Sequence, residues 1–275
     1  MAGFKVNGHQ PDPENPNYWD FKVLSAAMGW SAGSGDAELR PYSSAVHDQR
    51  TSGSCVTNAA AKALEIRERH HKAVDLGIPL DQVTHTDISR LHLYFLCREM
   101  MNPSQVNMDN GTHISLCCDI LHRFGICPES EWPFDLKKLY IPPSWKAMRK
   151  AYSASKIGLS GYYRIKSTWG SPVEDCIKAL RMGHPVVFGT TVDEKQWFNY
   201  KKDMVLKPVS NAEGRHATCL VGWDDSRGLF IGENSWGPNW GDKGCYLMSP
   251  ETIDDHDSSD FWVIRGHWED SPAPK

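Results

Sequence analysis

The sequence has few cysteines, no long apolar run and no marked excess of either charge. Eight cysteines among 275 residues fall far below the density of disulfide-stapled proteins, so we expect free thiols. The apolar stretches are interrupted within about ten residues, which is too short for a membrane-spanning helix. Lys and Arg number 30 against 34 Asp and Glu, a balance that gives no broad electrostatic reason to bind nucleic acid or a membrane. These absences exclude a stapled miniprotein and argue against nucleic-acid and membrane partners.

The N-terminal stretch also lacks the apolar core of a secretory signal peptide. Residues 1–40 are rich in Pro, Asn, Gly and Ser, apart from a short apolar run over 21–30. This composition is typical of an extension and not of a folded domain. Since the thiols are expected to be free and no export signal is seen, we expect a cytoplasmic protein.

What is present is the composition of a globular chain, with 40% hydrophobic and 23% charged residues. Helical patterns dominate residues 41–157, with an Ala-rich helix from Ser54 onward and two more over 87–100 and 112–124. Residues 158–275 consist of short β-rich runs with one helix over 171–182. We predict an α+β fold of two lobes, one helical and one an antiparallel sheet or small barrel, with the active-site cleft between them.

Cys55 lies in the first turn of the Ala-rich helix, where free backbone N–H groups and the helix dipole stabilise a thiolate. The position suits a nucleophile, although a cysteine near a helix start is by itself more often a small buried residue. Gln49, six residues upstream, is a carboxamide donor that could stabilise an oxyanion together with the Cys55 N–H. Gly53 would let the chain turn tightly into the helix.

A candidate base for this thiol occurs in the second half of the chain. His216 opens a β-rich run, and Asn234 follows the next run, within NSWGPNWG. Adjacent antiparallel strands could bring these two side chains together. Gln-x5-Cys opening a helix, His opening a strand and the Asn-Ser-Trp-Gly-x-x-Trp-Gly stretch together resemble the papain family of cysteine peptidases, in which Cys, His and Asn follow this order.

The resemblance covers residues 42–265 and implies a role for each reacting group. Cys55 would be the nucleophile, His216 its partner and general acid, and Asn234 the group that orients the imidazole. Gln49 would donate to the oxyanion. Hydrolysis of a peptide bond through a thioester follows from these roles.

The resemblance also implies where a protein or peptide substrate binds. Trp236 would shield the hydrogen bond between the histidine and the asparagine, and Gly53 and Gly111 would lie beside the bound peptide, Gly111 as a backbone contact near its second residue. Part of the pocket for that residue would come from 258–261. No cofactor and no metal are implied, and the oligomeric state cannot be read from the sequence.

The departures from the family pattern concern structure and not chemistry. Ser52 stands where secreted members carry the cysteine of a disulfide, so we expect no disulfides. A zinc site is an alternative for the run that holds Cys117, Cys118, His122 and Cys127. It is disfavoured because paired Cys-x-x-Cys spacings are absent, and an amphipathic helix with inward cysteines fits the run better.

Two other functions stay open at this point. An acyl transferase could use the same scaffold, although Asn234 within NSWG favours hydrolysis. A papain-fold structural, virion-associated or binding protein is compatible with the sequence, because assembly surfaces leave no readable motif. Against it, all four reacting positions are filled. Finally, the extension is too short for a helical inhibitor domain yet too apolar to stay in water, so we expect it to pack over or beside the cleft.

Overall fold

The structure is a computed structural model, and it describes residues 4–31, 33–153, 158–166, 171–209, 212–255 and 258–270. The boundary expected between the helical lobe and the β-rich lobe, after residue 157, adjoins residues 154–157, which lie outside this described part. The described helices are α1 (Phe21–Ala27), α2 (Cys55–His70), α3 (Arg90–Met101), α4 (Ile114–Arg123), α5 (Trp145–Ser153), α6 (Pro172–Arg181), α7 (Glu194–Phe198) and α8 (Pro250–Asp254). The four helices expected from periodicity are found as α2, α3, α4 and α6.

The second half of the chain forms most of one sheet. Its strands are β1 (Ala37–Glu38), β2 (Leu159–Ile165), β3 (Val186–Val192), β4 (Val205–Leu206), β5 (Gly214–Asp224), β6 (Leu229–Glu233), β7 (Cys245–Met248) and β8 (Ser258–Gly266). The order is β2-β8-β3-β5-β6-β7-β4, with β1 added beside β5, and every pair is antiparallel except β4 with β7. The α+β class is therefore confirmed. Within the described residues the outer strands β2 and β4 do not pair, so the sheet is open and not a closed barrel.

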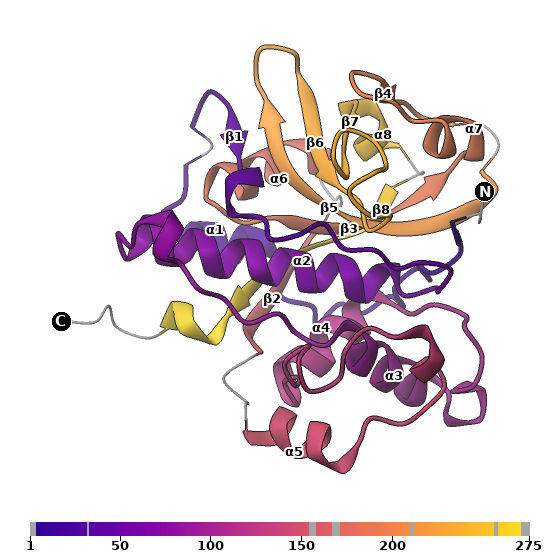
Figure 1. Cartoon of the computed structure of the whole chain (residues 1–275). Coiled ribbons are helices and arrows are strands. Elements are labelled where there is room, and N and C mark those ends of the chain that lie inside the picture. Colours follow the sequence, from indigo (N-terminus) through magenta and orange to yellow (C-terminus); the bar gives the residue numbers. More distant parts are fainter. Residues whose placement is uncertain are drawn as a thin grey trace.

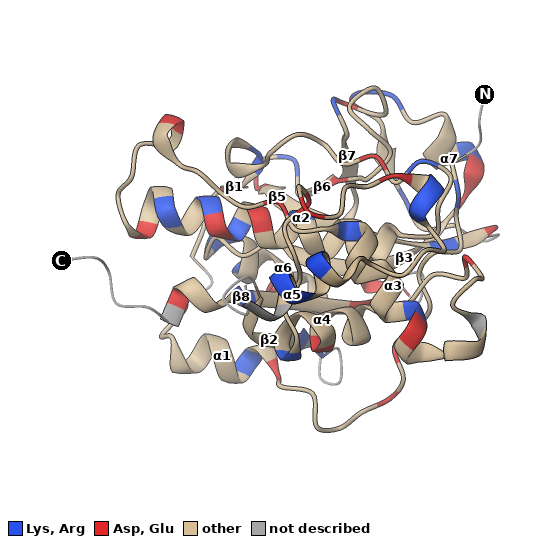
Figure 2. Ribbon diagram, turned by 60° about the horizontal axis from the view of Figure 1, so that its bottom comes forward, with Lys and Arg blue, Asp and Glu red and all other residues tan. Residues whose placement is uncertain are grey.

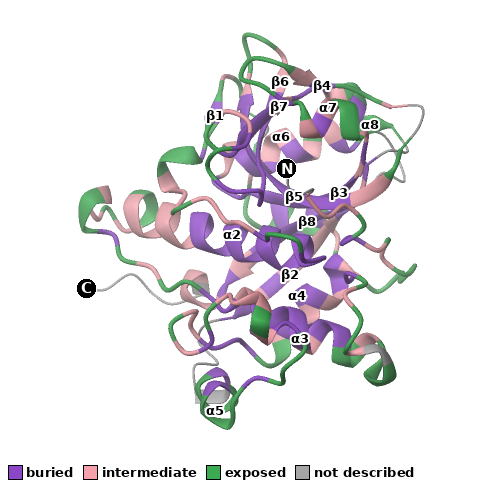
Figure 3. Ribbon diagram, turned by 45° about the vertical axis from the view of Figure 1, so that its right-hand side comes forward, coloured by how far each residue is buried: buried purple, intermediate pink, exposed green. Residues whose placement is uncertain are grey.

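Helix α2 lies between the sheet and the helices α3, α4 and α5 (Figure 1). Every residue from Cys55 to Arg67 is buried, and Figure 3 shows this helix buried along most of its length. Its alanines present little bulk, so strands β5 and β8 pack closely against it. The first residue of α2 is thus held between the two layers of the molecule.

The N-terminal extension contributes two elements to the body. Helix α1 begins at Phe21, whose ring is buried, and the Asp20 side chain caps it by accepting from the Lys22 N–H at 2.8 Å. Strand β1 pairs with β5 through Ala37 opposite Trp223. The residues before α1 do not join these elements and are described with the site below.

Basic and acidic residues are interspersed along the ribbon (Figure 2), in keeping with the balanced composition. Among the described helices, none combines the length and the apolar character needed to cross a membrane.

Candidate active site

The turn before α2 is fixed by an aspartate from a distant loop. The Gly53 N–H donates to both carboxylate oxygens of Asp109, at 2.9 and 3.0 Å, and the Tyr94 hydroxyl donates to the same carboxylate at 2.7 Å. The Ser52 hydroxyl donates to the Gln49 carbonyl at 2.7 Å. These bonds hold the turn without a disulfide, and they place Cys55 at the first position of α2.

His216 and Asn234 meet because β5 and β6 are neighbouring strands. Cys219 of β5 is paired with Glu233, the last residue of β6, so Asn234 emerges beside the start of β5. The His216 Nε2 and the Asn234 Oδ1 are 2.8 Å apart. This bond leaves Nδ1 of the ring free to act on another group, and Nδ1 has no hydrogen-bond partner among the described residues.

The Cys55 sulfur lies against the same strand. Its Sγ accepts from the backbone N–H of Ala217 at 3.4 Å, so the thiol is beside the residue that follows His216. Helix α2 and strand β5 therefore bring the predicted nucleophile and the predicted base to one place. Both side chains are fully buried.

Gln49 is oriented from both ends of its carboxamide. Its Nε2 donates to the Ser52 carbonyl at 2.8 Å, and its Oε1 accepts from the Ser235 hydroxyl at 2.7 Å. A second, longer contact of 3.5 Å runs from Nε2 to the carbonyl of Lys5 in the N-terminal extension. The donor is therefore held in a fixed direction near Cys55.

Aromatic rings surround the His216 imidazole. The rings of Trp236 and Trp197 lie 5.0 and 5.7 Å from it, measured between centroids. Phe4 of the extension stacks on Trp236 at 4.5 Å with nearly parallel planes. The predicted shield of this histidine is thus covered in turn by a residue from the N-terminus.

Residues 4–13, here called the covering segment, run directly over Cys55. A Cβ built on Gly8 would lie 2.6 Å from the Cys55 Sγ and 2.5 Å from the Gly53 carbonyl oxygen, so only glycine fits there. On the β side, the Asn7 N–H donates to the Arg215 carbonyl at 2.8 Å. These contacts confirm the expectation that the extension packs over the site.

The covering segment pairs with the loop that contains Gly111. Its Gly8 carbonyl accepts from the Thr112 N–H, and its Gln10 N–H donates to the Thr112 carbonyl, each at 3.0 Å. Gly111 itself donates to the Tyr94 hydroxyl, and a Cβ there would be 2.2 Å from the Gly8 oxygen. The Gly8 carbonyl therefore points to Thr112 and not to the donors around Cys55.

Burial shifts the pKa values of Cys55 and His216 in the directions that disfavour a thiolate–imidazolium ion pair. Burial raises the pKa of the Cys55 thiol to about 12, against the opposing effect of the Ala217 N–H. Burial lowers the pKa of His216 to about 4, although the hydrogen bond with Asn234 opposes the shift. Both shifts disfavour the thiolate and imidazolium forms while the segment covers the site.

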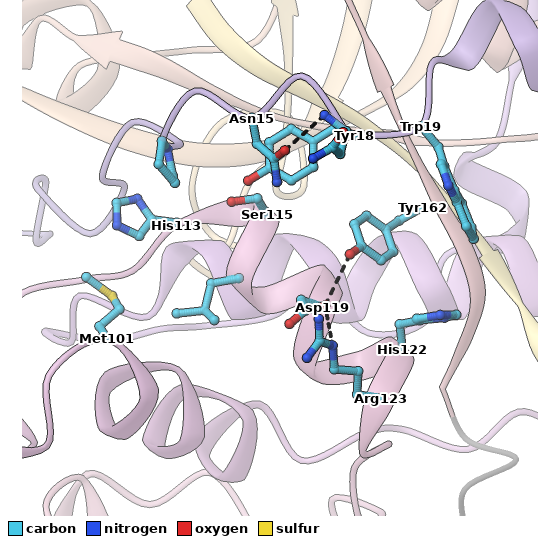
Figure 4. Close-up of a pocket in the computed structure, with 13 residues that line it drawn as sticks. Asn15, Tyr18, Trp19, Met101, His113, Ser115, Asp119, His122, Arg123 and Tyr162 are labelled. Atoms are coloured by element: carbon cyan, nitrogen blue, oxygen red, sulfur yellow. Dashed lines mark hydrogen bonds and ion pairs between the residues drawn. The ribbon is translucent and has the colours of Figure 1, made fainter.

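A cavity in the described part of the chain lies away from these residues. Its volume is about 710 Å³, and it lies between residues 13–19 and helix α4 (Figure 4). Tyr162 and Arg123 both contact Asp119 in its wall, at 3.2 and 2.8 Å. None of the predicted site residues is among its described lining residues. The predicted site is not open because the covering segment fills it.

All eight cysteines are free thiols and buried. Among the described residues, Cys117, Cys118, His122 and Cys127 do not form a ligand cluster, and the one group with metal-ligand spacing is Glu65, His85 and Asp87. Glu65 is already engaged, since it accepts from Lys62 at 2.9 Å and contacts His47 at 3.1 Å. The Glu65 carboxylate is thus paired with Lys62 and His47, and Asp87 lies 2.7 Å from His85.

Several residues of the site were not identified from the sequence. They are Lys5, Gly8, His9, Asp12, Tyr94 and Asp109, whereas Asp260 lies in the stretch 258–261 that was expected to form part of the pocket for the second substrate residue. Asp109 precedes the Asn-Gly turn at 110–111, the only local signal that could have singled it out. Tyr94 contacts Asp109 from 15 positions away without any local signal. The residues of the covering segment have partners about 100 to 250 positions away in the chain, as in the contact of His9 with Asp260 and that of Lys5 with Asp109.

Comparison with known proteins agrees with this geometry. Residues 36–256 match the family described as papain family cysteine protease. A peptidase C1-like protein of Acanthamoeba polyphaga mimivirus is 32% identical over 227 residues, which are 79% of this chain and 68% of that protein. Cysteine proteinase 2 of Entamoeba histolytica is 26% identical over 74% of this chain, which spans 59% of its length.

Solved structures give the same result. Xylellain, a cysteine protease from Xylella fastidiosa, is 28% identical, with a TM-score of 0.74 over 96% of this chain and 97% of that one. A cysteine protease of Carica candamarcensis shares the fold, with a TM-score of 0.61 over 85% of this chain and 99% of that one, at 17% identity. The chain therefore belongs to the papain family of cysteine proteases.

Proposed function

We propose that this protein hydrolyses peptide bonds with Cys55 as nucleophile, His216 as acid and base, and Asn234 as the residue that orients the imidazole. The observation that carries the proposal is the 2.8 Å contact between the His216 Nε2 and the Asn234 Oδ1. That contact turns the remaining ring nitrogen toward other groups, while Cys55 lies beside the same strand at a helix N-terminus. Gln49 is the proposed side-chain donor to the oxyanion.

The reaction follows from these positions. The Cys55 thiol gives its proton to His216, and the sulfur forms a bond to the carbonyl carbon of the peptide. The oxyanion accepts from Gln49 Nε2 and the Cys55 N–H. The C–N bond then breaks, and His216 gives its proton to the leaving amine. A water molecule loses a proton to His216, its oxygen attacks the thioester, and the sulfur leaves and is protonated again.

The covered form is the resting state in this proposal. The thiol and the imidazole are buried, and the substrate position is filled by residues 4–10. The Gly8 carbonyl is bound by Thr112, so the Gly8–His9 peptide is not presented for attack. Release of the covering segment would return water to the site, which favours the thiolate and imidazolium forms.

The test uses the full chain with a mixed fluorogenic peptide library and a thiol-alkylating epoxide. Cys55→Ala should abolish peptide turnover and epoxide labelling, whereas Cys97→Ala, a change at another buried cysteine, should leave both within about twofold. His216→Gln should lower turnover by at least about a thousandfold. Labelling that maps chiefly to Cys97, Cys127 or Cys176 would show that the nucleophile is wrongly assigned.

A further inference from the structure

Helix α5 and the turn before it expose a group of large apolar side chains. Of the twelve large hydrophobic residues that are exposed in the described part of the chain, four lie within nine positions. They are Tyr140, Ile141, Trp145 and Met148, with exposed fractions from 36% to 74%, and Trp145 is the most exposed of the twelve. A single exposed apolar residue is normal on a protein surface, whereas a group of this kind indicates an interaction surface.

The fold holds α5 with this group outward. Ala147 and Ala151, one turn apart on the helix, are buried in an apolar cluster with Leu91 of α3. Trp145 and Arg149 are also one turn apart, and both are exposed. Helix α5 lies at the end of the helical lobe away from most of the sheet, where Figures 1 and 3 show it protruding from the body. The apolar residues are therefore presented on a fixed and protruding end of the molecule.

Positive charge accompanies these residues. Residues 136–150 hold five basic side chains and no acidic one, although the chain as a whole has a formal net charge of -4. The basic residues are Lys137, Lys138, Lys146, Arg149 and Lys150. Lys146 is paired with Glu131 at 2.8 Å, whereas the exposed Lys137 and Arg149 form no ion pair among the described residues. The balanced composition, which argues against a membrane partner, therefore conceals a local excess of positive charge.

This combination matches the interfacial region of a membrane that contains anionic lipids. Trp and Tyr rings are favoured at the level of the lipid headgroups, where an apolar ring and its polar N–H or O–H are both accommodated. Lys and Arg reach anionic headgroups with their charged ends, and each basic residue near the surface strengthens binding about fivefold. A lipid surface also adapts to a protruding end, whereas a protein partner needs a surface of complementary shape.

We propose that the protein binds anionic lipid bilayers through Tyr140, Ile141, Trp145 and Met148 and the basic side chains of residues 136–150, here called the α5 surface. Binding is peripheral, because none of the described helices can cross a membrane. Four apolar side chains and a polybasic patch give reversible attachment and not permanent insertion. The proposal goes beyond the peptidase function and does not depend on it.

The test is sedimentation of the full chain with vesicles of phosphatidylcholine that contain about 30% phosphatidylserine, compared with vesicles of phosphatidylcholine alone. The partition constant should be at least about tenfold larger for the anionic vesicles and should fall as salt is added. No binding to the anionic vesicles at about 0.1 M salt, or equal binding to the two kinds, would overturn the proposal. Because no peptide is hydrolysed in this assay, its result is independent of the proposed function.

The apolar part is tested with Trp145→Gln, which should weaken binding to the anionic vesicles by at least about tenfold because it removes the most exposed ring. Trp19→Gln is the matched control, since Trp19 is 52% exposed and lies outside the α5 surface. It should change the partition constant by less than about threefold. Equal losses in the two variants would show that the α5 surface is not the binding site.

The charged part is tested with Lys137→Gln combined with Arg149→Gln. Loss of two charges should weaken binding by at least about tenfold. Lys201→Gln combined with Lys202→Gln, at two exposed lysines of the β-rich lobe, should change it by less than about threefold. Unfolding is not expected in either pair, because all four side chains are exposed.

A soluble acidic polypeptide, polyglutamate, distinguishes a lipid surface from an acidic protein partner. The unchanged protein should bind it more weakly than the anionic vesicles, and Trp145→Gln should not affect that binding, since polyglutamate offers no apolar phase for the ring. Binding to polyglutamate that is tighter than binding to the vesicles would assign the α5 surface to a protein partner and overturn the proposal.

Discussion

The two parts of the N-terminal extension are attached to the body by different forces. The part that forms α1 and β1 is anchored through buried apolar side chains, among them Phe21, Leu24 and Leu39. The covering segment is held mainly by backbone pairing and by polar contacts, such as those of Lys5 with Asp109 and His9 with Asp260. The apolar burial is lost only when the anchored part detaches from the body, whereas a partly exposed polar contact such as that of Lys5 with Asp109 is exchanged readily with water. The difference indicates that the covering segment can leave while the anchored part stays.

The largest expected effect is on the anchored part. Phe21→Ala should lower the free energy of unfolding by about 3 to 5 kcal/mol, because it removes a fully buried ring. Its effect on Cys55 labelling in the folded protein should be small. Denaturant melts give the first quantity, and Val23→Ala, at a side chain that is 67% exposed, is the control with an expected change within about 0.5 kcal/mol. If the rate of Cys55 labelling rose by the factor that corresponds to the lost free energy of unfolding, the two parts would have to move together.

Changes in the covering segment should have the opposite pattern, with a large effect on Cys55 labelling and a small effect on stability. Gly8→Val should raise the rate of Cys55 labelling by at least about a hundredfold, since a steric cost of about 3 kcal/mol corresponds to that factor. The melting midpoint should change little. Glu14→Val, an exposed position near the same segment, is the control. Unchanged labelling in a folded Gly8→Val variant would show that the segment does not control access.

Acid should also favour the uncovered form. Because burial lowers the pKa of His216 to about 4 from an ordinary value of 6.5, the covered form disfavours its protonation. This stabilisation of the covered form is present above pH 6.5 and is lost as the pH falls toward 4, so protonation of His216 alone should raise the open population by about twentyfold between pH 7 and 5. Burial and the charge of Asp260 raise the pKa of Asp12, which acts in the opposite direction.

The measurement is the 19F spectrum of 4-fluorophenylalanine at position 4, which distinguishes the ring stacked on Trp236 from the released ring. In the His216→Gln variant, the increase of the released-ring signal that protonation of His216 causes at acid pH should disappear. A spectrum whose pH dependence is identical in the two proteins would contradict this account.

The smallest effect is expected at the ion pair at the edge of the site. Lys5→Ala removes the 2.6 Å contact with Asp109 and should raise Cys55 labelling by about fivefold or less, because half-exposed ion pairs contribute about 1 kcal/mol. Lys22→Ala is the matched control in the anchored part, where the pair with Asp175 is 3.9 Å long. Salt at high concentration should reproduce the Lys5→Ala effect in the unchanged protein, and a lack of any salt response would argue against an electrostatic hold.

The sequence predicts those parts of the molecule whose signals are local. The Ala-rich periodicity predicts α2, the alternating runs predict the central strands, and NSWGPNWG identifies the position of Asn234. The short helices α7 and α8 have too few turns for a periodic signal. The open sheet is also beyond local patterns, since closure depends on which outer strands meet.

The covering contacts could not be predicted for a different reason. His9 and Asp260 are 251 positions apart, and neither belongs to a motif. The role of Gly8 depends on the distance between its Cα and the Cys55 sulfur, which no pattern of residue types encodes. Composition alone predicts that the extension packs on the site, but not the residues through which it does so.

The central claim is that Cys55 becomes accessible by release of the covering segment and not by unfolding. Labelling of the unchanged protein by a small alkylating reagent, followed by mass spectrometry in increasing concentrations of urea below the melting transition, tests it most directly. Cys55 should be labelled at a rate almost independent of urea, because opening of about ten residues exposes little surface. Cys176 and Cys219, which are also buried, should be labelled only with the steep urea dependence of global unfolding. If all three thiols share that steep dependence, the covering segment is part of the cooperative fold and the account is wrong.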